Sequence, residues 1–422
     1  MWQGRLGIVV LLLVAALIAA PAYVGSGRGA RDGQVEVYSW WTGPGEEDGL
    51  RAMIGDFEAK NPGLHLINAA VSGGAGSNAK AILASRLLAD DPPDSYQRHA
   101  GLELADDVRS GKVADLTSLY AEQRWTAVLP RGLLDKLTID GKLYSVPVNI
   151  HRANLIWYRP ATLRSLGIAG PPRSWAQFRQ QAATIRAKGL TPLTVGPEWT
   201  RKHLLETVLL GELGPDGYEA LWRGSAAWSR PETLAALDVF REVLAQSDVG
   251  SGAADWQPQL DRVTAGSAVY AVMGDWTYSY LAITKKLAWD KDFAVAASPG
   301  SDGVFDFLSD SFTLPTGARH PDLARRWLVE CGSAAGQDLF NPLKGSIPAR
   351  TDADANHYTG YLRWSLWQWR DPRTRIVGSL THGVVADNAW NAEIDTALGL
   401  FLRDRDTAKF ARTVANAYED TR

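Results

Sequence analysis

Aromatic and polar side chains that suit carbohydrate binding occur together at several turns of this sequence. A sugar ring offers an apolar C–H face, on which an indole can stack, and a rim of hydroxyls that donate and accept hydrogen bonds. Tryptophan is unusually frequent, with 17 Trp against 10 Phe. The candidates at expected strand ends and in loops are Trp40, Trp41, Glu46, Glu47, Gln97, His99, Trp256, Asp275, Trp276, Asp310, Lys344 and His382.

The spacing of some candidates indicates how they point. Gln97 and His99 are two residues apart, so on a strand their side chains face the same side. Trp40 and Trp41 are adjacent and face opposite sides of a strand, so at least one of them is expected in the core. A carboxylate or an ammonium group can form charge-assisted hydrogen bonds with hydroxyls, each worth about 1.5–3 kcal/mol.

Each candidate also has a structural interpretation that needs no ligand. Asp275 and Asp310 could form turns or cap helices, and Lys344 could be a solvated loop charge. Gln97 and His99 could be ordinary residues at the end of a strand. Other side chains are expected to pack in the interior, namely Trp175, Trp222, Trp327, Trp364, Trp367, Trp369 and Cys331.

Composition excludes several classes of protein. The chain of 422 residues carries a net charge of −3, so no basic field indicates nucleic acid or an anionic membrane surface. A single cysteine excludes an intramolecular disulfide and every zinc cluster built on cysteines. The seven histidines show no ligand spacing, and His203 and Glu206 are interpreted as neighbours on a helix surface. We therefore expect no metal and no cofactor. A phosphate-binding loop with its Lys-Ser/Thr is absent, which excludes an ATPase subunit.

The N-terminus has the layout of a secretory signal peptide. Arg5 precedes an apolar run from Leu6 to Ala20, and small residues at Ala20 and Ala22 predict cleavage after Ala22. An uncleaved membrane anchor is the alternative. Residues 23–34 are polar and rich in glycine, so they are expected to form a flexible tether.

Strand and helix patterns alternate through the rest of the chain. Residues 35–41 and 64–71 are typical of buried strands, and helical spacing of apolar residues follows each of them. Residues 142–158 form a long extended stretch, which predicts a strand running between two lobes. Ser174 and Ser229 are expected to cap helices, the second with Pro231 just inside its start. This order indicates an α/β fold with a mostly parallel sheet covered by helices.

Eight segments of the chain carry a resemblance to a known family. In order, they are "SWWTGPGEE", "DPPDSYQRHAGLEL", "YSVPVNIHRANLIWY", "PPRSWAQF", "GSAVYAVMGDW", "LSDSFTLP", "NPLKGSIPAR" and "RIVGSLTHGVVA". Together they resemble the substrate-binding proteins of bacterial ABC sugar importers, in the branch that includes maltose-binding protein, and within it the glucose-binding proteins. The similarity extends from about Val35 to the C-terminal helix.

The resemblance implies a two-lobed periplasmic binding protein type II fold. Each lobe would be a mixed sheet flanked by helices, with the ligand in the cleft between the lobes. Residues 35–147 and 312–347 would form the first lobe, and residues 148–311 and 348–422 the second. Hinge segments near Pro147 and Ser309-Asp310 would permit closure.

The resemblance also implies roles for individual residues. Trp40 and Trp41 would lie in the cleft wall, Trp256 would stack on the sugar, and Trp276 would support the wall. Gln97 and His99 would line the first lobe. Asp310 and Lys344 would bond the hydroxyl rim, and His382 would close it from the second lobe. Glu46 would bond a hydroxyl, but "TGPGEE" is one residue longer than the glucose-binding pattern, which leaves Glu46 and Glu47 both open.

The expected function is therefore binding of a monosaccharide, with glucose first and galactose second, and its delivery to the membrane permease of an ABC importer. The protein would be an exported monomer in the periplasm or at the cell surface, with no catalytic residues. One alternative is a member of the same family that binds an oligosaccharide or glycoside. The other is a secreted carbohydrate-active enzyme that uses Asp310 and Glu46 as a carboxylate pair.

Overall fold

The structure is a computed structural model that describes residues 33–72, 76–249 and 255–421. The predicted signal peptide, its cleavage site and most of the predicted tether lie outside the described residues. Within those residues, no helix combines the length and apolar character that crossing a membrane requires.

A first mixed sheet is built mainly from the N-terminal part of the chain. Its strand order is β2-β1-β3-β14-β6, with β1 parallel to β2 and β3, and β14 antiparallel to β3 and β6. Its strands are β1 (Gln34–Ser39), β2 (His65–Ala70), β3 (Ser95–His99), β6 (Ser145–Pro147) and β14 (Asp310–Thr313). The expected parallel order holds for its first three strands, and the chain then returns to add two antiparallel ones.

A second mixed sheet is built from the middle of the chain. Its order is β10-β9-β11-β8-β12, with β9 parallel to β10 and β11, and β8 antiparallel to β11 and β12. Its strands are β8 (Leu155–Tyr158), β9 (Thr191–Val195), β10 (Ser247–Val249), β11 (Ala268–Val272) and β12 (Ala294–Ala297).

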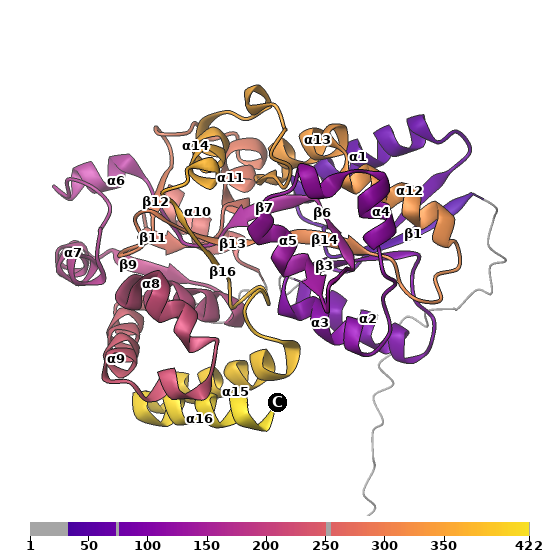
Figure 1. Ribbon diagram of the computed structural model, residues 1–422. Coiled ribbons are helices and arrows are strands. Elements are labelled where there is room, and N and C mark those ends of the chain that lie inside the picture. Colours follow the sequence, from indigo (N-terminus) through magenta and orange to yellow (C-terminus); the bar gives the residue numbers. More distant parts are fainter. Residues whose placement is uncertain (1–32, 73–75, 250–254, 422) are drawn as a thin grey trace, which may run out of the picture. The chain divides into compact units, whose positions relative to one another are not determined.

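A third, four-stranded sheet lies between the other two (Figure 1). Its order is β15-β7-β13-β16, formed by β7 (Asn149–Arg152), β13 (Val304–Leu308), β15 (Ile347–Pro348) and β16 (Arg375–Gly378). The expected long strand over residues 142–158 is thus interrupted. It contains β6, β7 and β8, which belong to the first, third and second sheets respectively. A hairpin formed by β4 (Thr138–Ile139) and β5 (Lys142–Leu143) precedes β6.

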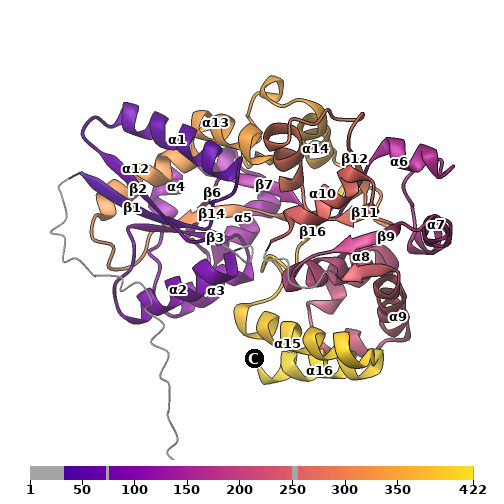
Figure 2. The ribbon, with the colours of Figure 1, turned by 180° about the vertical axis from the view of Figure 1, so that it is seen from behind.

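Helices pack on both large sheets (Figure 2). On the first sheet, α12 contacts β1, β6 and β14, and α3 contacts β3. On the second sheet, α7 contacts β9, and α10 contacts β8, β9 and β11. The helices are α1 (Glu46–Lys60), α2 (Ser77–Leu88), α3 (Leu102–Arg109), α4 (Thr117–Glu122), α5 (Arg131–Leu137), α6 (Pro160–Ser165), α7 (Trp175–Ala187), α8 (Glu198–Leu221), α9 (Pro231–Ala245), α10 (Gln257–Ala265), α11 (Trp276–Tyr278), α12 (Pro321–Gly332), α13 (Ala334–Lys344), α14 (Gly360–Arg370), α15 (Asn388–Asp404) and α16 (Thr407–Asp420), with short turns η2 (Trp125–Ala127), η3 (Ser225–Ser229), η4 (Ser279–Thr284) and η5 (Ala355–His357).

The predicted caps have different outcomes. The Ser174 hydroxyl accepts a hydrogen bond from the backbone N–H of Gln177 and caps α7, as expected. Ser229 does not cap α9, because Arg230 occupies the N-cap position and the Ser229 hydroxyl donates to the carbonyl of Ala226. Pro231 is at the first position of α9, which its fixed φ favours.

The interior contains most of the tryptophans assigned to it. Trp175, Trp222 and Trp327 are buried, and so is Cys331. On α14, Trp369 is buried, but Trp367 is 57% exposed. The prediction that Trp367 packs in the interior is therefore wrong. Successive α14 positions point in different directions around the helix, and Trp367 falls on the solvent side.

Candidate functional site

One pocket collects most of the predicted site residues. It is lined by Trp40, Glu46, His99, Trp256, Trp276, Asp310, Lys344 and His382, together with His151, Trp199 and neighbouring residues. Its cavity volume is about 120 Å³. This is well above the roughly 10–15 Å³ that a single water molecule needs, so a small ligand can enter.

Strand ends of the first sheet position one wall. His99 is the last residue of β3 and Asp310 is the first of β14, and the two are direct partners across the antiparallel pair. Trp40 directly follows β1, which is parallel to β3. Binding sites in α/β sheets commonly form outside the carboxyl ends of parallel strands. Residues from three strands therefore meet at one edge of the sheet.

Helix starts and a loop supply other side chains. Trp256 is the N-cap residue of α10, and Trp276 is the first residue of α11. His382 lies in the turn between β16 and α15. The Trp276 and His382 rings are in contact, with centroids 5.3 Å apart. These elements belong to the part of the chain that builds the second and third sheets.

Asp310 is a buried carboxylate held by two amides. Its Oδ1 accepts a hydrogen bond of 2.8 Å from Nε2 of Gln97, and its Oδ2 accepts one of 2.8 Å from Nδ2 of Asn149. Burial would raise the pKa of Asp310, but Lys344, His151, His99 and the Asn149 hydrogen bond together hold it below its ordinary value of 3.8. Asp310 is therefore an ionised acceptor at neutral pH.

A histidine lies on each side of Asp310. His99 Nε2 is 3.6 Å from Oδ1, and His151 Nε2 is 3.6 Å from Oδ2. The other nitrogen of each ring meets a second acid: His99 Nδ1 lies 2.9 Å from Oε2 of Glu103, and His151 Nδ1 contacts Asp275. These outer acids fix the orientation of both rings.

Glu103 is ionised although it is buried. Burial would raise its pKa, but Lys80, His99 and Arg98 hold the pKa well below its ordinary range. Nζ of Lys80 donates a hydrogen bond of 2.8 Å to Glu103 and also lies 5.2 Å from the centroid of the Trp40 ring. The position of Trp40 is thus coupled to the charges behind His99.

Glu46 and Glu47 have different surroundings. Glu46 lines the pocket and pairs with Lys344, the last residue of α13. Glu47 is exposed and pairs with Arg51, one turn further along α1. Gly45, which precedes them, has φ of 84°. A Cβ on Gly45 would lie 1.9 Å from Oγ of Ser279 and 2.7 Å from the carbonyl oxygen of Leu343, so only glycine allows α1 to start this close to its neighbours.

Partly buried aromatic rings complete the pocket. Trp40, Trp199, Trp256 and Trp276 are neither fully buried nor fully exposed. Trp256 contacts Tyr280 edge to face, with ring centroids 5.5 Å apart, so its orientation is supported from the side. Ionised groups and indole faces therefore open into the same cavity.

Comparison with known proteins assigns the family. Residues 43–338 match the family described as "Bacterial extracellular solute-binding protein". The chain belongs to this family. Its members are binding proteins rather than enzymes.

Similar proteins cover nearly the whole length of this solute-binding protein. An uncharacterized ABC transporter extracellular-binding protein of Pyrococcus horikoshii is 30% identical over 91% of this chain and 87% of its own length. A probable sugar-binding periplasmic protein of Brucella suis is 28% identical over 87% of each chain. The glucose-binding protein GlcS of Saccharolobus solfataricus is 21% identical, over 86% of this chain and 69% of its own.

Solved structures confirm the predicted fold class. The bacterial solute receptor AcbH, described as having an exclusive preference for β-D-galactopyranose, superposes with a TM-score of 0.79. The superposition covers 93% of this solute-binding protein and 99% of AcbH, at 16% sequence identity. A chitin oligosaccharide binding protein superposes equally well, with a TM-score of 0.79 at 15% identity, covering 92% and 98% of the two chains.

Four of the twelve candidates do not line the pocket: Glu47 and Asp275, whose contacts are given above, and Trp41 and Gln97. Trp41 is fully buried and packs between Phe312 and Phe340, with ring centroids 5.4 and 4.4 Å away. The expectation that it forms part of the wall is wrong, because the extended backbone directs adjacent residues to opposite sides. Gln97 is buried behind the wall, where it bonds Asp310 and accepts from the backbone N–H of Trp40.

Two pocket residues were missed in the sequence. His151 is on β7, two residues after Asn149, and its Nε2 has no hydrogen-bond partner among the described residues. Trp199 is on the first turn of α8. The alternation of Asn149 and His151 in an extended segment was a signal that could have identified the histidine.

The interpretation of His203 and Glu206 as surface neighbours is also wrong. Both side chains are fully buried on α8. The residues from Thr207 to Leu210 are buried as well, so this part of the helix is covered on all sides. His382, from the pocket, lies beside them, with ring centroids of His203 and His382 5.8 Å apart.

Proposed function

We propose that this solute-binding protein binds a monosaccharide, glucose or galactose, and delivers it to the permease of an ABC importer. The observation that supports this most strongly is the pocket itself. It combines an ionised, oriented carboxylate on Asp310, a Glu46–Lys344 ion pair, histidines and partly buried indoles. This is the set of groups that a sugar requires, with apolar faces for its C–H surface and charged groups for its hydroxyls.

The size of the cavity favours a single sugar unit. Its volume of about 120 Å³ is small beside the roughly 300–1,000 Å³ of pockets that hold drug-sized ligands. A member of the family that binds an oligosaccharide would need a longer groove.

The names of the similar proteins agree with a sugar. Relatives that align over most of this chain are described as sugar-binding and glucose-binding, and the superposed receptor AcbH prefers a galactose. The relative described as glucose-binding is only 21% identical, so its name gives glucose little support.

Each pocket residue has a proposed role. Trp256 stacks on the apolar face of the sugar, and Trp40 and Trp276 form the adjacent walls. The charged hydroxyl partners are Asp310, Glu46 and Lys344. His99 and His382 bond the remaining hydroxyls, and His151, with its unpartnered Nε2, is added to this set. Gln97, Asn149 and Asp275 orient these groups without touching the ligand.

Closure around the sugar is proposed to occur at the segments between the sheets. Pro147 ends β6 of the first sheet, and Asn149 begins β7 of the third. Ser309 separates β13 of the third sheet from β14 of the first. Residues 35–147 with 312–347 and residues 148–311 with 348–422 are the proposed lobes. A ligand that bonds both lobes prefers the closed state and shifts the population towards it.

The proposed setting is outside the cytoplasm. The N-terminal segment is proposed to direct export and to be cleaved after Ala22, which leaves the monomeric protein in the periplasm or at the cell surface. The family description as extracellular supports this location.

An enzyme that uses the same pocket is a weaker candidate. A glycoside hydrolase needs one carboxyl group with a raised pKa as the proton donor. The pKa of Asp310 is instead lowered, and Glu46 is held by Lys344. Incubation with chromogenic glucosides and galactosides checks this, because turnover above that of an Asp310→Asn variant would favour the enzyme.

A ligand screen by thermal shift tests the proposed function. The purified mature chain is heated with single monosaccharides, disaccharides and longer glucans. Ligands that bind only the folded state raise the unfolding midpoint in proportion to RT ln(1 + [L]/Kd). The largest shift is expected with glucose or galactose. A shift confined to oligosaccharides would replace the monosaccharide by a longer ligand, and no shift with any carbohydrate would contradict the proposal.

A further inference from the structure

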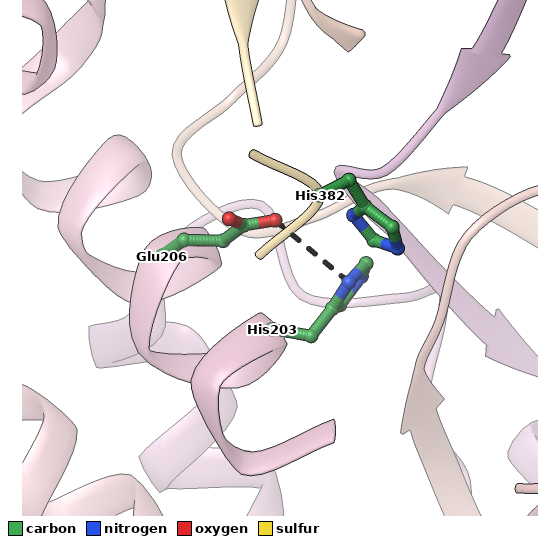
Figure 3. A group of neighbouring side chains, drawn as sticks. All are labelled: His203, Glu206 and His382. Carbon is green, nitrogen blue, oxygen red and sulfur yellow. Dashed lines mark ion pairs between the residues drawn. The ribbon is translucent and has the colours of Figure 1, made fainter. Parts of the chain in front are cut away.

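His203, Glu206 and His382 form a buried cluster (Figure 3). His382 also lines the pocket. His203 and Glu206 lie one turn apart on α8, and His382 comes from the turn after β16. Each residue offers one atom that could bind a metal ion, and these three atoms lie within 4.8 Å of one another. The proposed function does not account for the two residues on α8.

The hydrogen bonds of His203 determine which ring nitrogen carries the proton. Its Nε2 lies 3.0 Å from the carbonyl oxygen of Ala153, which can only accept, so Nε2 carries the hydrogen. In the neutral ring with its hydrogen on Nε2, the other nitrogen, Nδ1, carries a free lone pair. This nitrogen is fully buried and has no hydrogen-bond partner among the described residues.

The free nitrogen faces an acceptor. Nδ1 of His203 lies 3.8 Å from Oε1 of Glu206, along the dashed line in Figure 3. Glu206 already accepts hydrogen bonds from the Ser379 hydroxyl and from the backbone N–H of Thr381. Two lone pairs directed at each other in a buried site repel unless a positive group lies between them.

His382 presents a further nitrogen. The Ser379 hydroxyl has one hydrogen, and when it donates that hydrogen to Glu206, it must accept from Nδ1 of His382. Nε2 of His382 is then also without a hydrogen. The cluster thus offers two neutral imidazole nitrogens and one carboxylate.

We propose that His203, Glu206 and His382 bind a divalent transition-metal ion of the Zn²⁺ class. Two histidines and one glutamate are a recurrent zinc ligand set that leaves a position open for water or another ligand. The Ala153 carbonyl and the Ser379 hydroxyl are the outer partners that orient the two imidazoles, as around other metal sites. Hard ions such as Mg²⁺ or Ca²⁺ prefer oxygen ligands and are not expected here.

The surroundings provide an entry path and require a small movement. His382 also lines the open pocket, so an ion can reach the cluster from that side. A Zn²⁺–nitrogen bond is about 2.0–2.1 Å long, so the three side chains must draw closer together when the ion binds. The other positive group that could separate the lone pairs is a proton on Glu206, since burial raises the pKa of this residue to about 7.

Calorimetric titration with Zn²⁺ tests the site. The mature chain is used without a histidine tag, stripped with a chelator and titrated in the absence of sugar. One ion per chain is expected, and His203→Gln or Glu206→Gln should weaken binding by at least about tenfold. His357→Gln serves as the matched control, because His357 is an exposed histidine beside an acid, Asp338, and its loss should change nothing.

Two outcomes overturn the proposal. In the first, the wild-type chain takes up no Zn²⁺, and the two lone pairs are then separated by a proton on Glu206. In the second, His203→Gln and Glu206→Gln bind Zn²⁺ as tightly as the wild type, and the ion then lies elsewhere. If the variants fail to fold, anomalous diffraction at the zinc edge from wild-type crystals decides the question. A peak between the three residues supports the site, and a peak only elsewhere or no peak overturns it.

Discussion

Nε2 of Gln97 donates a hydrogen bond of 2.8 Å to Oδ1 of Asp310, although the two residues are 213 positions apart in the chain. The bond joins β3 to β14, whose residues Gln97 and Phe312 are direct partners in the sheet. Asn149 holds the other oxygen of the same carboxylate. Asp310 is therefore oriented before any ligand arrives, which reduces the entropic cost of binding.

Replacement of Asp310 by asparagine should weaken sugar binding. The variant loses the ionised acceptor and places an amide N–H₂ against the donors of Gln97 and Asn149. Charge-assisted hydrogen bonds of about 1.5–3 kcal/mol correspond to a loss of roughly ten- to hundredfold in affinity, measured by calorimetry. Asp322→Asn, at the exposed start of α12, is the control. An unchanged Kd for Asp310→Asn would remove this residue from the site.

The same variant should show a pH-dependent difference in stability. The folded pKa of Asp310 is below its ordinary value of 3.8, so its stabilising contribution is present above that value and is lost as the pH falls through the folded pKa. Asparagine cannot ionise. The unfolding midpoint of Asp310→Asn should therefore lie below that of the wild type at neutral pH, and the gap should narrow in acid. A gap that widens in acid would contradict the lowered pKa.

Glu46 and Glu47 form a matched pair for mutation. Glu46→Gln removes a charged group from the pocket and takes the partner from Lys344, so sugar affinity should fall by at least about tenfold. Glu47→Gln alters only an exposed contact with Arg51 and should leave affinity unchanged. Calorimetry of both variants decides which carboxylate is used, and the reverse pattern would show that the α1 start is misassigned.

Trp256→Ala should weaken binding without unfolding the protein. Its partly buried ring lines the pocket, and loss of an aromatic face is expected to reduce affinity by about tenfold. Trp367→Ala is a suitable comparison, since Trp367 is 57% exposed and lies outside the residues that line the pocket. Equal Kd values for the two variants would exclude stacking on Trp256.

Two glycines in or near α1 should respond to alanine in opposite directions. Gly45→Ala forces a Cβ into contact with Ser279 at positive φ and should cost at least about 1–2 kcal/mol in the free energy of unfolding. Gly55 is an exposed position within the helix with open space around it, so Gly55→Ala should stabilise by about 1 kcal/mol. Denaturant unfolding measures both. A stable Gly45→Ala variant would mean that the close approach at the pocket is not required.

Much of the architecture could be predicted from local patterns. Helical spacing and the alternation of strands and helices identified the α/β class, because each element buries one apolar face. The mixed character of the sheets could not be predicted from the residues alone, since β14 joins the first sheet from more than two hundred residues away. Here the family resemblance supplied what periodicity does not contain.

The site was predicted where residue type and resemblance agreed. Of the twelve candidates, eight line one pocket, and the other four, Trp41, Glu47, Gln97 and Asp275, do not. The prediction for Trp41 failed because adjacent residues of an extended backbone point to opposite sides. The sequence leaves open which of two adjacent tryptophans faces the interior. His151 was missed because its partner Asp275 is 124 positions away. His203 and Glu206 were placed on the surface because spacing along one helix does not show what covers it.

Calorimetric titration of the mature wild-type chain with D-glucose and D-galactose, with maltose as the longer comparison, tests the central claim most directly. The account predicts one site per chain and a Kd near or below micromolar, about −8 kcal/mol, for one of the two monosaccharides. If the folded protein in the calorimeter binds neither glucose nor galactose, the account is contradicted.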